Sequence, residues 1–227
     1  MKAIIIMVNL LFATSILNAQ YISNFNEVAR IARFNKSLDE INNGKAVLKY
    51  SDIQGNSFYK SGFSNAKVGD AEHILPVRYN LFKDSFEVLN NNDIYSIPLD
   101  NAFSKFVFIA NNEKFILSND AAGVSGYFLV LTEGKNKLLK KMSVKYSPEI
   151  PAPNTLISGT PAKFEVQRPI YFIKTAENVI KVTKKADDLL SALPADKKDA
   201  AKDFIKSNKI KLNDELDLIK LVTFLNK

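Results

Sequence analysis

The pattern of apolar and polar positions divides the chain into three parts. Between residues 24 and 43 apolar side chains recur three or four positions apart, so we expect a helical segment within residues 20–44. From residue 45 to 183 the apolar runs are short and are separated by turn residues, as in consecutive β-strands. From residue 184 onward the helical spacing returns. The apolar stripe of the first part consists of Val28, Ile31, Phe34, Leu38 and Ile41.

The central part, residues 45–183, predicts an antiparallel sheet of about 9 to 11 strands. The turns between the runs are too short for the helical crossovers that parallel strands need. Two runs, KFVFIA at 105–110 and YFLVL at 127–131, are apolar at both odd and even positions, which is typical of central strands covered on both faces. We therefore expect a mainly β (α+β) fold, with an antiparallel meander curled into a sandwich or half-barrel.

A basic stretch, KNKLLKK at 135–141, lies within a run of alternating residues. Leu138, Met142, Val144 and Tyr146 share one parity, and lysines occupy the other. This alternation predicts one strand over 137–146, with its apolar face buried and its lysine face in water. The lysine face is a weak candidate for an anion-binding surface. Its members are Lys137, Lys141 and Lys145.

Residues 147–163 contain four prolines and show little periodicity, which predicts a loop about 15 residues long. Such a loop either carries function or simply connects two layers of the fold. The segment from Phe164 to Lys184 then predicts two more strands, with the turn TAEN between them.

The last part, residues 184–227, predicts two to three helices packed on the sheet. Pro194 ends the first helix, and Asp196 lies near the start of the second. Asn213 is the expected N-cap of the last helix. That helix carries an apolar stripe which either docks on the rest of the fold or binds a partner. The stripe consists of Leu218, Leu221, Val222 and Leu225.

The N-terminus has the features of a secretory signal peptide over residues 1–19. Lys2 supplies the positive charge, residues 3–17 form an apolar run, and Ala19 is the small residue before the expected cleavage site. A retained anchor or a buried helix is the alternative, although the run is short for a membrane span. No cysteine follows it, which excludes a lipid anchor on cysteine. We expect export to the periplasm or the medium, with a mature chain starting at Gln20 and no transmembrane segment.

Composition limits the chemistry that this chain can perform. It has no cysteine and one histidine, His73, so tetrahedral zinc sites and most redox metals lack ligands. No nucleophile motif accompanies His73, and the GVSG run at 123–126 does not match a phosphate loop. We predict no catalytic, cofactor-binding or metal-binding residues. The 24 acidic residues nevertheless leave a hydrolase that uses two carboxylates open.

The net charge of +7 indicates contact with an anionic glycan or lipid surface, or simply a lysine-rich solvated surface. The second interpretation is the more common one. Nucleic acid is not an expected partner, because the export signal directs the protein away from it and no known binding motif is present.

The segment VRYNLFKDSFEVLNN at 77–91 concentrates most of the polar chemistry. Its alternation predicts a hairpin with a two-residue turn at Lys83 and Asp84. That register sets Tyr79 opposite Val88 on the core side. Arg78 and Glu87 become diagonal neighbours on the other side, where such a pair contributes little, toward the low end of about 0.2–1 kcal/mol. The segment is then a scaffold rather than an active site.

Several segments together resemble an uncharacterised family of exported β-rich proteins from Bacteroidota. They are GNSFYKSGFSNAKV at 55–68, LPVRYNLFKDSFEV at 75–88, GYFLVLTEGKNKLLKK at 126–141 and the C-terminal run from Asp203. The resemblance covers roughly residues 55–227 and implies export and a single β-rich module with C-terminal helices. It implies no activity. Its hairpin motif is matched by Arg78, Tyr79, Asn80, Asp84 and Glu87.

We thus expect a non-enzymatic envelope or secreted protein with a binding or assembly role, whose partner is an envelope protein or an anionic surface. One alternative is a carrier of a lipid or another apolar ligand inside the curled sheet, because 16 Phe and 8 Tyr enrich strands that are apolar on both faces. The other is the carboxylate-pair hydrolase.

Overall fold

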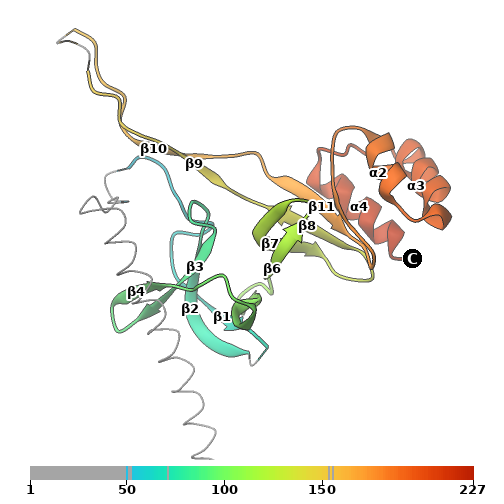
Figure 1. The fold of residues 1–227 in the computed structure, drawn as a ribbon, viewed down its shortest axis with the longest axis horizontal. Helices are drawn as coiled ribbons and strands as arrows, with labels where there is room; N and C mark the ends of the chain where they lie inside the picture. The colour runs from blue at the N-terminus through green and yellow to red at the C-terminus, as the bar shows by residue number, and fades with distance from the viewer. Residues whose placement is uncertain (1–49, 51–52, 71, 153, 155) are drawn as a thin grey trace, which may run out of the picture.

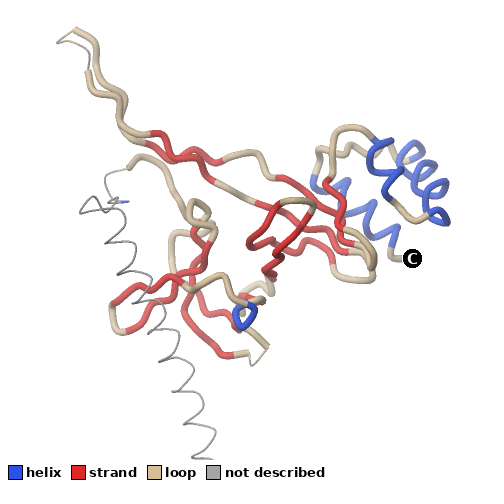
Figure 2. Tube along the Cα trace, viewed as in Figure 1, coloured by secondary structure: helices blue, strands red, loops and turns tan. Residues whose placement is uncertain are grey.

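The computed structural model describes residues 50, 53–70, 72–152, 154 and 156–227. The expected signal peptide and the predicted helix within 20–44 lie outside these residues. Along the described chain the strands come first and the α-helices last (Figure 1). The α-helices α2, α3 and α4 lie together at one end, with a long hairpin pointing away from them (Figure 2). The mainly β fold expected from the sequence is confirmed.

Ten strands form one antiparallel sheet in the order β12-β11-β8-β7-β6-β5-β1-β2-β3-β4, and two more form a separate ribbon. The sheet begins at β12 and ends at β4, so it is not closed into a barrel. Its strands are β1 (Ser64–Val68), β2 (His73–Asn80), β3 (Ser85–Asn90), β4 (Asp93–Ser96), β5 (Lys105–Phe108), β6 (Lys114–Ala121), β7 (Val124–Thr132), β8 (Lys137–Lys141), β11 (Ile170–Lys174) and β12 (Val179–Lys181).

The strand order departs from a simple meander at two places. After β4 the chain passes through a short 3-10 helix, η2 (Asn101–Phe103), and returns to pair β5 with β1, as in a Greek key. After β8 it leaves the sheet to form the two-stranded ribbon, and then comes back to pair β11 with β8.

Turns between adjacent strands depend on residues that accept a left-handed backbone. Asn91 and Asn92, with φ of 47° and 69°, connect β3 to β4. Ala122 and Gly123, with φ of 52° and 81°, connect β6 to β7. Two consecutive residues with positive φ match the right-handed twist of the flanking strands, which is why asparagine and glycine recur there.

The sheet is strongly curled. The rings of Tyr79 in β2 and Tyr127 in β7 lie 6.2 Å apart, although three strands separate β2 from β7 in the sheet. Four strand spacings in a flat sheet would put them about 19 Å apart. Aromatic rings fill the inside of this curl, and those of Phe86 and Phe106 stack at 3.7 Å.

Strand β7 contributes to three hydrophobic clusters. Tyr127 and Leu129 belong to the cluster inside the curl, and Phe128 belongs to a cluster on the opposite face with β8 and β11. Leu131 packs against both the first cluster and a third one beneath the helices. This confirms that the YFLVL run forms a central strand covered on both faces.

Three helices close one end of the fold: α2 (Ala186–Ala192), α3 (Ala195–Ser207) and α4 (Glu215–Leu225). The helix α2 ends just before Pro194, as predicted. The N-cap of α4 is Asp214, whose side chain accepts a hydrogen bond from Asp217 N, so the prediction of Asn213 is wrong by one residue. The apolar stripe of α4 is buried against the sheet and α3, as predicted for a docked helix. It consists of Leu218, Leu221, Val222 and Leu225.

The strand predicted over 137–146 is two strands. β8 ends at Lys141, and β9 (Val144–Ser147) pairs with β10 (Lys163–Val166) in the separate ribbon. The alternation continues across the break because both halves bury their apolar residues, but in different places. Leu138 lies beneath the helices, whereas Val144 lies in the cluster inside the curl.

Candidate functional site

The hairpin of β2 and β3 has a different register from the one predicted. Tyr79 faces Phe86 and Arg78 faces Glu87 directly, so the predicted diagonal arrangement is wrong. The turn spans residues 81–84 rather than two residues. Asn80 explains the difference, because its Oδ1 accepts hydrogen bonds from the N–H groups of Phe82 and Lys83, each at 3.1 Å. An asparagine side chain that bonds to the following backbone in this way builds the longer turn.

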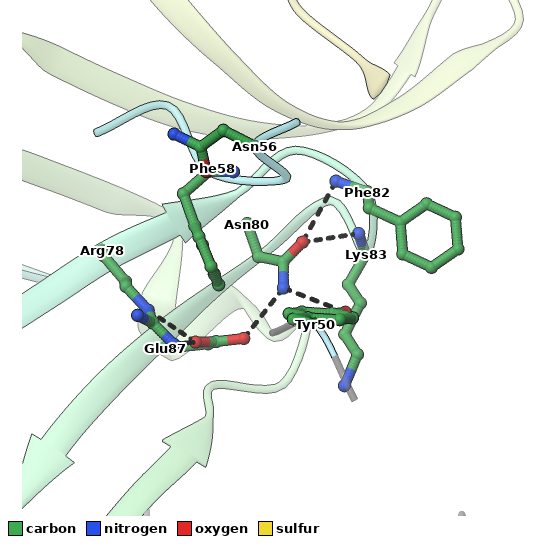
Figure 3. A network of polar contacts seen from close by, with 8 residues as sticks. All are labelled: Tyr50, Asn56, Phe58, Arg78, Asn80, Phe82, Lys83 and Glu87. Carbon is green, nitrogen blue, oxygen red and sulfur yellow. Dashed lines mark hydrogen bonds and ion pairs between the residues drawn. The ribbon is translucent and has the colours of Figure 1, made fainter. Parts of the chain in front are cut away.

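On one side of the hairpin, Arg78, Asn80 and Glu87 form a polar network with Tyr50 (Figure 3). Arg78 Nη2 lies 2.7 Å from Glu87 Oε2, and its Nε donates to the same oxygen at 2.8 Å. Asn80 Nδ2 donates to Glu87 Oε1 at 2.9 Å and to the Tyr50 hydroxyl at 3.3 Å. Both carboxylate oxygens of Glu87 therefore have donors.

This network is enclosed rather than open to substrate. The side chain of Glu87 is 6% exposed, and that of Arg78 is 17% exposed. The guanidinium carbon of Arg78 lies 3.8 Å from the ring centroid of Phe58 and 4.5 Å from that of Phe63. Burial raises the pKa of the Tyr50 phenol, which keeps it protonated. The network ties the segment before β1 to the hairpin and fixes the register of β2 and β3.

A second polar cluster lies where the turn after β2 meets the other half of the sheet. Lys141 Nζ lies 2.6 Å from Asp84 Oδ2. The Tyr79 hydroxyl and the Tyr127 N–H both donate to Asp84 Oδ1, the latter at 3.3 Å. Lys141 Nζ also donates to the carbonyl oxygen of Tyr127 at 3.1 Å. We call these four residues the clasp, because they join β2 to β7 and β8 across the curl.

The side chain of Lys141 is 11% exposed, so the prediction of a solvated lysine is wrong. Its burial lowers the pKa of the ammonium group, and the charge of Asp84 opposes that shift. The partner lies 57 residues away along the chain and reaches Lys141 only because the sheet curls. Lys141 Nζ also lies 4.9 Å from the ring centroid of Phe128.

Gly126 makes the close approach of Asp84 possible. A Cβ atom built on Gly126 would lie 1.7 Å from Asp84 Oδ2 and 2.5 Å from Lys141 Nζ. Its φ of 113° is also one that residues with a side chain rarely adopt. Glycine is therefore required at this position for both space and backbone geometry.

The five residues of the hairpin motif thus fall into two groups. Arg78, Asn80 and Glu87 belong to the polar network, whereas Tyr79 and Asp84 belong to the clasp. His73 begins β2, at the far end of the strand from Asn80, and does not join either group. No group of three or more histidine, aspartate or glutamate residues suited to a metal ion occurs in the described part of the chain.

A long hairpin, which we call the arm, projects from the described fold: β9, β10 and the connection between them, residues 144–166. The described residues between β9 and β10 form a loop, as predicted, and within it Ile150 and Thr160 exchange backbone hydrogen bonds at 2.8 and 2.9 Å. At the end of the arm, Asn154 Oδ1 accepts from the N–H groups of Leu156 and Ile157 at 2.9 and 3.0 Å. The four prolines of this segment give no sign in the sequence of the pairing between Ile150 and Thr160.

The base of the arm is anchored in the core. Phe164 and Val144 are buried in the cluster inside the curl. Gln54 adds a bridge alongside β10, with Phe164 N donating to Gln54 O at 2.7 Å. Beyond this base, every described residue from Pro148 to Pro161 is exposed.

Comparisons with protein-family models, with curated proteins and with solved structures gave no match. Within the described residues, none of the helices has the length and apolar character needed to cross a bilayer.

Proposed function

We propose that this is an exported, non-enzymatic protein that binds a protein partner in the periplasm or outside the cell, and that the arm is its contact segment. The observation that supports this proposal is the exposure of three large apolar side chains on the part of the arm beyond its base. Ile150, Leu156 and Ile157 are 63%, 91% and 56% exposed, respectively.

An isolated two-stranded ribbon is marginally stable in water, so a projecting one gains stability when a partner covers it. Concentrated apolar exposure marks contact surfaces on soluble proteins. The base of the arm is anchored in the core through Val144 and Phe164. A pre-ordered contact segment loses less conformational entropy on binding than a disordered one does.

The composition of the tip favours a protein partner over an anionic surface. Between residues 147 and 162 there is no lysine, arginine or aromatic residue, and Glu149 is the only charged residue. Binding to anionic lipids or glycans relies on basic residues, and insertion at a bilayer surface relies on aromatic and basic ones. The prolines remove backbone donors, which disfavours strand addition. We infer that the partner offers an apolar groove for the side chains of the tip.

The test is photo-cross-linking in the native cells, with a photoreactive amino acid in place of Leu156. The matched control carries it in place of Leu216, which is 68% exposed on α4, far from the arm in the sequence. We expect one adduct of defined mass from position 156 and none from position 216. Adding Ile157→Asp should abolish that adduct while the free energy of unfolding stays unchanged. Equal labelling from both positions, or an adduct that survives Ile157→Asp, would contradict the proposal.

The carrier and hydrolase alternatives stay predictions that no observation favours. The inside of the curl is occupied by packed rings, among them Phe86, Phe106, Phe115 and Tyr127. The buried carboxylate of Glu87 has donors on both oxygens, as a structural ion pair does.

A further inference from the structure

We infer that the clasp is a modification site at which the amine of Lys141 and the carboxyl group of Asp84 condense into an amide bond within the chain. Such a bond would join the turn after β2 to the end of β8 covalently. It would act as a cross-link in a chain that has no cysteine. The proposal is independent of the arm and of its partner.

The first support is contact between the reacting groups in a largely dry place. Lys141 Nζ lies 2.6 Å from Asp84 Oδ2, and the two side chains are 11% and 29% exposed. Among the described ion pairs that involve lysine, this lysine is the most buried. Holding two groups together in this way replaces a slow bimolecular encounter with an intramolecular step.

The second support is the arrangement of donors around the carboxyl group. Oδ1 accepts hydrogen bonds from the Tyr79 hydroxyl and the Tyr127 N–H, so it is polarised as a carbonyl oxygen. Oδ2 faces the amine. Burial and the neighbouring Asp84 raise the pKa of the Tyr79 phenol far above its ordinary value, so this donor keeps its proton. Donors aimed at the oxygen on which negative charge develops stabilise a tetrahedral intermediate.

The third support is the environment of the Lys141 amine. Burial lowers the pKa of Lys141, which favours the free amine that acts as a nucleophile. Apolar surroundings also favour the neutral amine over the charged ammonium group. The Phe128 ring supplies part of these surroundings, and Gly126 leaves the space in which the two groups meet.

The reaction balances without any other reactant. The Lys141 ammonium passes a proton to Oδ2, and its nitrogen then attacks the carboxyl carbon of Asp84. Negative charge develops on Oδ1, where Tyr79 and Tyr127 N–H stabilise it. A second proton moves from nitrogen to the Oδ2 hydroxyl, the bond between carbon and Oδ2 breaks, and water leaves. One C–N bond replaces one C–O bond, and nothing is oxidised or reduced.

The experiment is intact-mass spectrometry of the purified, denatured full chain, followed by peptide mapping. We expect a mass lower by one water molecule than the sequence requires, and a branched peptide that joins Asp84 to Lys141. The variant Lys141→Arg keeps the positive charge but lacks the reactive amine, so it should have the full mass. The matched control is Lys140→Arg, because Lys140 pairs with Glu215 at 2.7 Å; this variant should still lose water.

The proposal is overturned if the parent protein has its full mass. It is equally overturned if Lys141→Arg still loses water, because the loss then comes from cyclisation elsewhere in the chain. If Lys141→Arg does not fold, Asp84→Ala provides the same comparison. The cross-link is supported if the branched peptide occurs in the parent and in Lys140→Arg but is absent from Lys141→Arg.

Discussion

Arg78 and Glu87 lie directly opposite one another across β2 and β3, with Arg78 Nη2 2.7 Å from Glu87 Oε2. The pair is largely buried, and two phenylalanine rings, those of Phe58 and Phe63, cover the guanidinium group. The energetic role of a buried pair differs from that of the weak, diagonal surface pair that the sequence predicts. Removing one partner leaves the other charge buried and uncompensated.

Arg78→Ala should therefore lower the free energy of unfolding by about 3–5 kcal/mol, as measured by urea denaturation. The double variant Arg78→Met with Glu87→Leu removes both charges and should recover most of the loss, because no isolated charge remains. A loss below about 1 kcal/mol for Arg78→Ala would place the pair among solvent-screened surface pairs and contradict this interpretation.

Gly126→Ala should destabilise the protein more than Gly123→Ala does. Both glycines have positive φ, so either alanine adds backbone strain of about 1–2 kcal/mol. Only at Gly126 does the new methyl group collide with Asp84 and Lys141; at Gly123 it meets nothing within 4 Å. We expect an additional loss of about 2 kcal/mol at Gly126 from the disrupted clasp. Equal losses in urea denaturation would show that the clasp adds no stability.

Stability should fall steeply above pH 10. Burial raises the pKa of Tyr79 and Tyr127 above the ordinary value of 10.0, and the charge of Asp84 adds to both shifts. The native state then holds protons that the unfolded chain releases, so this contribution is complete below pH 10 and is lost as the pH rises. For each phenol, the free energy of unfolding should fall by about 1.4 kcal/mol with every pH unit above the pKa of the phenol in the unfolded chain.

In protein that has not formed the amide bond, Lys141 acts in the opposite direction, because the pKa of its free amine is lowered from 10.5, so stability from this group increases as the pH rises toward that value. The fall should therefore be clearest above pH 10.5. Urea denaturation across this range measures it, and Tyr127→Phe should make the slope shallower. Tyrosinate absorbance of the folded protein should show incomplete ionisation near pH 10. Ionisation of every tyrosine while the protein stays folded would contradict the prediction.

Export should remove the first 19 residues. When the full sequence is produced in a bacterium with an intact secretion system, the exported protein should begin at Gln20, as determined by N-terminal sequencing or mass spectrometry. Leu11→Arg places a charge in the apolar run and should leave the full-length chain in the cytoplasm. Recovery of exported protein that begins at Met1 would instead support the retained anchor.

Local patterns were enough to predict those parts of the fold that depend on neighbours in the sequence. The apolar run at 127–131 correctly indicated a central strand, and the stripe from Leu218 to Leu225 correctly indicated a docked helix. Both features follow from a periodicity that is independent of what lies across from them. The turn between β2 and β3 is longer than predicted, because the side-chain amide of Asn80 accepts hydrogen bonds from the backbone that follows it.

The local sequence pattern could not predict the contacts of the clasp, for a different reason. Lys141 alternates with apolar residues just as a solvated lysine would, and its partner Asp84 lies in a turn 57 residues earlier. Only the curvature of the sheet brings the two together, and curvature has no signature in a local pattern. The one available signal was Gly126 at the start of the GYFLVL run, because a glycine inside a strand marks a close approach of another chain segment.

Strand β7 shares its residues among three cores, with Phe128 on one face, Tyr127 and Leu129 on the other, and Leu131 bridging toward the helices. No portion of the sheet that includes this strand can detach without exposing all three cores at once. Local fluctuations should therefore not reach its backbone amides. These protons should exchange with solvent only when the whole fold unfolds, so β7 should be the slowest-exchanging element. Through this strand the three cores should unfold together, as one cooperative unit.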